Sequence, residues 1–74
     1  MYMSSDISIK FAQKLKKLRK EKGYSQEELA FLCDLDRTYI GRLENLKRNP
    51  TLPVLDKIAK AFNMEICEML DFKE

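Results

Sequence analysis

Two helix-start signals lie close together in the middle of the chain, and they favour two short helices separated by a tight turn. The first signal is Ser25, because it is followed three residues later by Glu28. This spacing is typical of a capping box, in which the serine hydroxyl accepts the Glu28 N–H and the Glu28 carboxylate accepts the serine N–H. The helix that begins there is short and is expected to end near Cys33 or Asp34.

The second signal is Asp36, a favourable N-cap residue. Ile40 and Leu43 follow it at a spacing that places both on one helix face, toward a core. A turn of only about three residues would separate the two helices, which is typical of a helix-turn-helix. The second helix of such a motif projects a polar face into the major groove of DNA. That face would carry Arg37, Thr38, Gly41, Arg42 and Asn45.

The rest of the chain also favours helices, and no alternating strand pattern bounded by hairpin residues is present. Apolar residues at helical spacing predict a first helix over about 7–22, ended by Gly23. Thr51 is expected to cap a fourth helix, which Asn63 would end. A short last helix is expected over about 65–71. We therefore predict an all-α, five-helix domain that spans residues 1–74, with its core over about 9–71.

A chain of 74 residues can form one small domain, and a core of that size is marginal without further stabilisation. The chain has two cysteines and no histidine, so a zinc site with about four ligands is not expected. We interpret Cys33 and Cys67 as reduced thiols in the core. The remaining source of stabilisation is oligomerisation. No cofactor, metal or small-molecule ligand is expected, and neither a glycine-rich phosphate loop nor a cysteine–base pair indicates an enzyme.

The positive charge is concentrated at the start of the chain. Residues 1–24 contain seven Lys or Arg and two Asp or Glu, although the whole chain has a net charge of only +2. The lysines over 14–22 could contact phosphates or simply form a solvated face. No stretch approaches the roughly 20 apolar residues of a membrane span, and the N-terminus lacks a signal-peptide pattern. We expect a protein of the prokaryotic cytoplasm, without a membrane partner.

The segments 25–30, 36–40 and 43–45 resemble the helix-turn-helix of the Cro and lysogeny-repressor family, and the resemblance extends over residues 9–71. Together, 36–40 and Lys47-Arg48-Asn49-Pro50 are most similar to controller proteins of type II restriction–modification systems. This resemblance implies a lambda-repressor-like fold. It also implies a transcriptional regulator that binds a palindromic operator in double-stranded DNA as a homodimer, and that activates, represses or both. A phage-type repressor, an antitoxin and a protein-interaction module with the same fold remain alternatives.

The resemblance also implies roles for individual residues. The positions that read bases correspond to Arg37, Thr38 and Arg42. Gln26 corresponds to a residue that holds a phosphate, at a helix start whose free N–H groups favour anions. The other expected backbone contacts are Ser25, Tyr39, Asn45, Lys47, Arg48 and Asn49. A buried structural ion pair is implied between Arg19 and Glu44.

Partner contacts are expected at two further places. Near the C-terminus the chain has more apolar surface than one short helix can bury, and we expect it to form the dimer interface with the fourth helix. Its members are Met64, Ile66, Met69, Leu70 and Phe72. The resemblance implies that an activator of this kind contacts the sigma subunit of RNA polymerase, for which Glu27 and Glu28 are the candidates.

Three residues depart from the family pattern. Asp34 and Leu46 stand where glycine is usual after the two helices of the motif, and aspartate tolerates the left-handed conformation that such a position requires. Gly41 stands where a larger residue is common. It should weaken its helix by up to about 1 kcal/mol and could allow a close approach to DNA.

Overall fold

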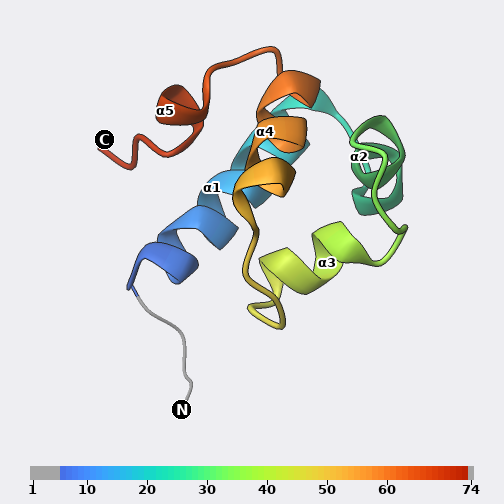
Figure 1. Ribbon diagram of the computed structural model, residues 1–74, viewed down its shortest axis with the longest axis horizontal. Coiled ribbons are helices and arrows are strands. Elements are labelled where there is room, and N and C mark those ends of the chain that lie inside the picture. The colour runs from blue at the N-terminus through green and yellow to red at the C-terminus, as the bar shows by residue number, and fades with distance from the viewer. Residues whose placement is uncertain (1–5, 74) are drawn as a thin grey trace.

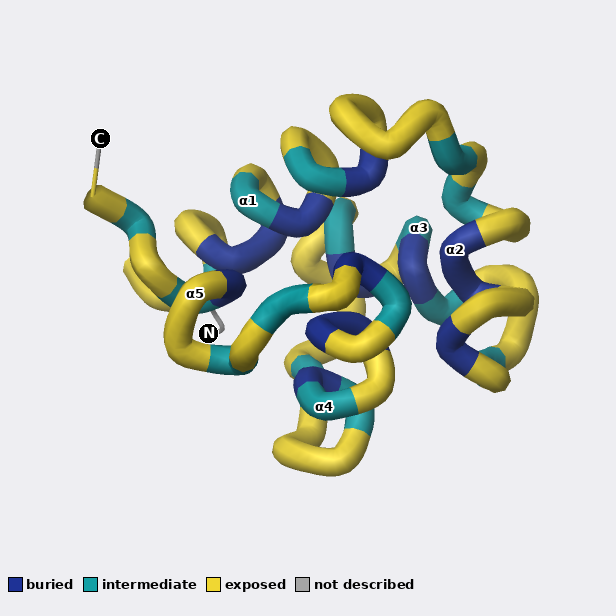
Figure 2. Tube along the Cα trace, turned by 90° about the horizontal axis from the view of Figure 1, so that it is seen from above, coloured by how far each residue is buried: buried dark blue, intermediate teal, exposed yellow. Residues whose placement is uncertain are grey.

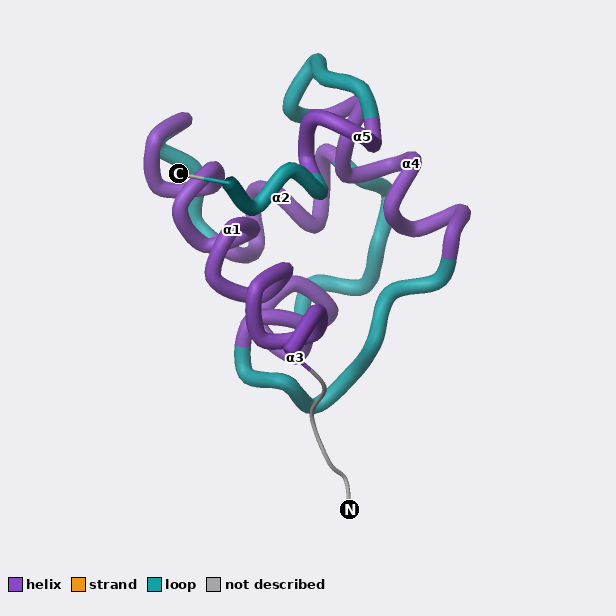
Figure 3. Tube along the Cα trace, turned by 90° about the vertical axis from the view of Figure 1, so that its left-hand side faces the viewer, coloured by secondary structure: helices purple, strands orange, loops and turns teal. Residues whose placement is uncertain are grey.

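The computed structural model describes residues 6–73, and this part of the chain folds into five helices without a strand (Figures 1 and 3). The predicted all-α, five-helix fold is therefore confirmed. None of the helices in this part is long and apolar enough to cross a membrane. The helices are α1 (Asp6–Lys22), α2 (Gln26–Leu32), α3 (Tyr39–Glu44), α4 (Leu52–Ala61) and α5 (Ile66–Met69).

The first four helices end in the same way, with one residue in the left-handed region directly after the C-cap. Two N–H groups then donate back to carbonyls of the last turn, as in the Schellman motif. After α3, for example, the N–H of Leu46 donates to the carbonyl of Leu43 at 3.2 Å, and that of Lys47 donates to Arg42 at 2.8 Å. The left-handed residues are Gly23, Asp34, Leu46 and Asn63.

Leu46 is the unusual member of this set, because a leucine is strained at its φ of 61°. It nevertheless takes the conformation that glycine would take at this position. The chain after α3 therefore turns away from the helix through a left-handed residue although that residue is not glycine. Asp34, with a φ of 57°, does the same after α2, as predicted.

The capping box that opens α2 is confirmed. The Ser25 hydroxyl accepts the Glu28 N–H at 3.0 Å, and a Glu28 carboxylate oxygen accepts the Ser25 N–H at 2.7 Å. Thr51 caps α4 as predicted, since its hydroxyl accepts the Val54 N–H at 3.3 Å. These side chains satisfy N–H groups that have no partner within their own helix.

The predicted start of α3 at Asp36 was wrong. The Asp36 carboxylate accepts both the N–H and the hydroxyl of Thr38, and the Tyr39 N–H donates to the Asp36 carbonyl at 2.9 Å. These bonds form a separate turn ahead of the helix, because short polar side chains compete with helical hydrogen bonds. Thr38 is therefore the N-cap, and the connection between α2 and α3 covers residues 33–38 rather than about three residues.

Side chains from all five helices meet in one core, toward which the buried parts of the trace turn in Figure 2. Burying one such large apolar side chain is worth about 1.5–3 kcal/mol. The small Ala30 of α2 is also fully buried, as expected for a residue at a close helix contact. The largest fully buried side chains are Leu15, Leu29, Ile40, Leu43, Ile58 and Met69.

The two cysteines differ. Cys33 is buried next to the end of α2, as predicted, but Cys67 is exposed, so the prediction of two core thiols was wrong for Cys67. The reason is the shortness of α5, whose single turn directs only one side inward. Ile66 and Met69 occupy that side and pack against the core, and Cys67 lies between them in sequence on the solvent side.

Candidate nucleic-acid interface

The helix-turn-helix is formed by α2 and α3, which pack against each other. α3 also packs against α1, and α2 against α4, so both helices of the motif are fixed to the rest of the domain. Figures 1 and 2 place this pair at the opposite side of the molecule from α5. Ile40 and Leu43 attach α3 to the core, since their exposed fractions are 0% and 1%. The other side of α3 is free to meet a partner.

The three predicted base-reading residues are all exposed. Arg37 has a 77% exposed side chain and lies 3.4 Å from the carboxylate of Glu27 on α2. The Thr38 hydroxyl donates to the Asp36 carboxylate. Arg42 lies one turn further along α3. All three residues are therefore accessible to a partner, as base reading would require, although Arg37 and Thr38 precede the helix proper.

The ion pair predicted between Arg19 and Glu44 is confirmed. Two nitrogens of the Arg19 guanidinium donate to the two carboxylate oxygens of Glu44, at 2.7 and 3.1 Å. A third bond runs to the Tyr24 carbonyl at 2.9 Å. The side chains are only 10% and 3% exposed. The hydrogen bond with Glu44 raises the pKa of Arg19 further, and the pair links α1 to α3.

Gln26 joins this pair, which the sequence did not reveal. Its side-chain Nε2 donates to Glu44 at 3.0 Å, while its Oε1 lies against Gly41. The space left by Gly41 is therefore filled by a side chain of the protein itself. Gln26 is partly buried, so the residue expected to hold a phosphate has a fixed orientation before any DNA is bound.

The other residues expected to contact the DNA backbone lie at the start of α2 and around the end of α3. Ser25, Asn45 and Lys47 are exposed. Tyr39 is half-buried, and the Arg48 guanidinium lies over its ring at 4.9 Å from the centroid. A cation near an aromatic face at this distance is attracted to it. The contact holds the loop after α3 close to the start of that helix.

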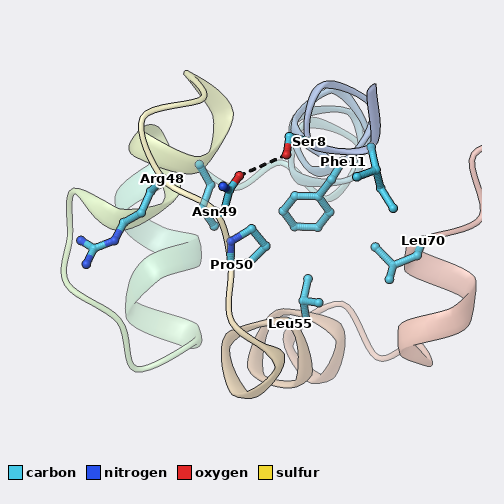
Figure 4. Close-up of a pocket in the computed structure, with 9 residues that line it drawn as sticks. Ser8, Phe11, Arg48, Asn49, Pro50, Leu55 and Leu70 are labelled. Carbon is cyan, nitrogen blue, oxygen red and sulfur yellow. Dashed lines mark hydrogen bonds between the residues drawn. The ribbon is translucent and has the colours of Figure 1, made fainter. Parts of the chain in front are cut away.

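The loop is also attached to α1. The hydroxyl of Ser8 donates to the side-chain oxygen of Asn49 at 3.1 Å, and Figure 4 shows this bond beside Pro50. A mainly apolar cavity of about 210 Å³ lies next to it, between α1, the loop, α4 and α5. Arg48 lines the edge of this cavity, and in Figure 4 its guanidinium extends away from Phe11, Leu55 and Leu70. No sequence pattern indicated a role for Ser8, because its partner Asn49 is 41 residues away along the chain.

An exposed apolar surface on α2 was also missed. Phe31 is 83% exposed and Leu32 is 50% exposed. Together with Tyr24, Glu27 and Glu28 they line a shallow depression on the outer side of the helix. Large exposed apolar side chains of this kind, with charged neighbours, are typical of interaction surfaces.

The residues expected at a dimer interface differ in exposure: four are partly exposed and one is buried. Met64, Ile66, Leu70 and Phe72 are partly exposed and pack on the outside of the core. Met69 is 0% exposed within the chain itself, so it packs in the core beneath the other four residues and cannot contact a partner directly. We refer to the four partly exposed residues as the C-terminal apolar surface.

Two titratable groups near the motif, Asp36 and Cys33, have shifted pKa values. The side-chain and backbone hydrogen bonds from Thr38, with a smaller effect of Arg42 and Arg37, lower the pKa of the Asp36 carboxyl. It therefore remains ionised and keeps Thr38 in place at neutral pH. Burial raises the pKa of the Cys33 thiol to about 11, against a smaller opposite effect of Lys57. A thiol with so high a pKa is a poor nucleophile.

Comparison with known proteins gives matches over most of the chain. A helix-turn-helix family model matches residues 15–69. The chain is 44% identical over 71 residues to control protein C.BamHI of Bacillus amyloliquefaciens, covering 95% of this chain and 88% of that protein. It is 50% identical over 66 residues to control protein C.MunI of a Mycoplasma species, covering 88% and 89%.

Solved structures give the same result. The restriction–modification controller protein C.AhdI of Aeromonas hydrophila superposes with a TM-score of 0.80 and 47% identity, covering 84% of this chain and 94% of that one. A structure of C.Esp1396I bound to a 25 base pair operator site superposes with a TM-score of 0.80 and 40% identity, covering 90% and 92%.

Proposed function

This chain belongs to the helix-turn-helix family, among the controller proteins of restriction–modification systems, and we propose that it regulates transcription by binding a palindromic operator as a homodimer. The observation that carries the proposal is the exposed, positively charged face of Arg37, Thr38 and Arg42 beside the fixed side chain of Gln26. A protein with 40% identity has been solved on an operator site. We assign its action to the prokaryotic cytoplasm, where operator DNA lies.

Base reading is assigned to the exposed face of α3 and the turn before it. Arg37 and Arg42 would each pair with guanine O6 and N7, and the Thr38 methyl group would contact thymine. Arg37 must first leave Glu27. An exposed ion pair is worth about 0–1 kcal/mol, whereas a bidentate pair with a base is worth about 1–3 kcal/mol. The exchange therefore favours DNA.

The DNA backbone would be held on both sides of this face. The contact of Arg48 with Tyr39 and the bond from Ser8 to Asn49 keep the loop after α3 in one place. Such contacts fix register and orientation on the duplex without reading its sequence. The residues assigned to this role are Ser25, Gln26, Tyr39, Asn45, Lys47, Arg48 and Asn49.

The C-terminal apolar surface is assigned to the dimer interface, together with the neighbouring part of α4. Its four side chains remain partly exposed although they are apolar, and α5 packs on α4. The same patch on two copies would meet across a two-fold axis, as in most homodimers. A two-fold dimer presents two copies of α3, and its operator would share that symmetry.

Activation would use the outer surface of α2. Glu27, Glu28, Phe31 and Leu32 form an exposed acidic and apolar surface, which fits a basic and apolar partner such as the polymerase sigma subunit. Phe31→Ser is expected to leave operator binding unchanged and to reduce activated transcription in a purified system. Full activation by this variant would contradict the assignment.

The test of base reading compares two alanine variants on a panel of operator duplexes that differ at single base pairs. Arg37→Ala should cost about 1–3 kcal/mol on the preferred duplex and abolish discrimination at one base pair in each half-site. Lys47→Ala should weaken binding to every duplex by a similar factor. If Arg37→Ala kept the discrimination of the wild type, the chain would use the fold without reading bases, as a protein-interaction module does.

A further inference from the structure

We propose that Gly41 is a positioning residue for DNA binding, because it leaves the space in which the Gln26 side chain is held ready for a phosphate. The inference rests on the proposed function, since it concerns how that function is achieved. Gly41 acts through Gln26 and needs no contact with DNA of its own.

The Gln26 amide is held from two sides. Its Nε2 donates to a carboxylate oxygen of Glu44 at 3.0 Å. A β-carbon at position 41 would lie 3.0 Å from its Oε1 and 3.4 Å from its Cδ. The first of these separations is tighter than an ordinary contact, so a side chain at position 41 would shift the Gln26 amide by a few tenths of an ångström. Glycine at this position lets Gln26 keep its bond to Glu44 without that shift.

Glu44 determines which way the amide faces. Its carboxylate only accepts hydrogen bonds, so the nitrogen and not the oxygen of the Gln26 amide must point to it. Glu44 itself is fixed by two bonds from Arg19, with a side chain that is 3% exposed. One N–H of the amide is used in this way, and the other is left for a phosphate oxygen. The partial exposure of Gln26 gives that oxygen access.

A glycine inside a helix is otherwise unfavourable. Alanine has a far higher helix propensity, so helix propensity alone favours Gly41→Ala for stability. The crowding at Gln26 acts on the partly buried side of α3 that meets α2, away from Ile40 and Leu43 in the core. Stability and DNA binding should therefore respond differently to this one methyl group, which a purely structural role for Gly41 does not predict.

The experiment is a double-mutant cycle with Gly41→Ala, Gln26→Ala and the double variant. Binding of the full chain is measured by fluorescence anisotropy, on the duplex preferred by the wild type and on the same duplex with one half-site altered. Gly41→Ala should weaken binding measurably and by up to about tenfold, since tenfold is the scale of losing one hydrogen bond to a charged group. The loss should be equal on both duplexes, because a phosphate contact carries no sequence information. The urea midpoint should stay the same or rise.

The cycle should show that the two positions act together. In the Gln26→Ala background, Gly41→Ala should produce no further loss of affinity. The salt dependence should stay close to that of the wild type, since a neutral amide releases no counterion. Lys47→Ala is the matched control, because removing a cation from a phosphate should lower the slope of log affinity against log salt by about 0.9.

Each of four results would overturn the inference. Binding of Gly41→Ala at wild-type affinity would show that the space is not needed. An equal loss in the Gln26→Ala background would show that position 41 meets DNA directly. A lower urea midpoint with lost discrimination between the duplexes would show a structural defect. If Gln26→Ala binds normally while Arg37→Ala does not, this inference fails and the proposed function stands; if the wild type binds no duplex, the proposed function itself fails.

Discussion

At the scale of single residues, Leu46 is the position where the fold requires a left-handed backbone conformation that leucine disfavours. Its φ of 61° costs an L-amino acid about 1–2 kcal/mol, and part of that would be offset by the larger unfolded-state entropy of glycine. Leu46→Gly should therefore stabilise the chain by about 0.5–1 kcal/mol. Urea denaturation should show a higher midpoint with an unchanged slope.

Gly23 provides the matched control, since it occupies the same position after α1. Its φ is 78° and no atom lies within 4 Å of a β-carbon built there, so only the backbone conformation opposes a side chain. Gly23→Ala should destabilise by about 1 kcal/mol. Loss of stability in Leu46→Gly would mean that leucine side-chain contacts outweigh the backbone strain, contrary to this account.

The sequence predicted some residues of the candidate site but not how they are joined. Arg37 and Arg42 were found because helical spacing and family resemblance both concern positions along the chain. The bond from Gln26 to Glu44 and the space at Gly41 were not found, because they depend on how closely α2 and α3 approach. Residue types and spacing do not determine that distance.

At the scale of the helices, the ends that carry local signals were predicted well. The capping box at Ser25 and the caps at Thr51 and Gly23 depend on residues within a few positions of each other. The start of α3 was predicted too early because Asp36 can cap a turn as readily as a helix. α5 was predicted too long. Cys67 was placed in the core although helical spacing from Ile66 and Met69, which pack there, puts it on another face.

The reactivity of the two cysteines should show that Cys33, after α2, is buried and that Cys67, on α5, is exposed. Iodoacetamide at pH 8 should modify Cys67 rapidly in the folded chain, because it is exposed. Cys33 should react only on unfolding, since it is buried and its pKa is raised to about 11. Mass spectrometry should find one adduct on the native chain and two in denaturant. Equal modification of both cysteines without denaturant would contradict the position of Cys33.

The raised pKa of Cys33 makes the stability of the folded chain depend on pH. A thiol whose pKa is higher in the folded state than in the unfolded chain contributes stability below its unfolded pKa, and this is lost as pH rises through the folded value. For Cys33 the window is from about pH 9 to about pH 11. Over that window Cys33→Ala should lose less stability than the wild type, as measured by urea denaturation at each pH.

At the scale of the whole molecule, the small core and the C-terminal apolar surface both favour a dimer. A chain of 74 residues buries a smaller fraction of its surface than a larger domain does. Sedimentation should show a dimer at micromolar concentrations, and Phe72→Ser should shift it toward monomer. The melting temperature of the wild type should rise with protein concentration. A wild type that stays monomeric with and without DNA would contradict the assignment.

The most direct test of the central claim is selection of binding sites for the full chain from a pool of random duplex DNA. If two copies of α3 read the major groove through Arg37, Thr38 and Arg42, the selected sequences should converge on a palindrome. Its half-sites should be centred about one helical turn, or roughly 34–36 Å, apart. A pool without enrichment, or one that converges on a single unrepeated half-site, would contradict the claim.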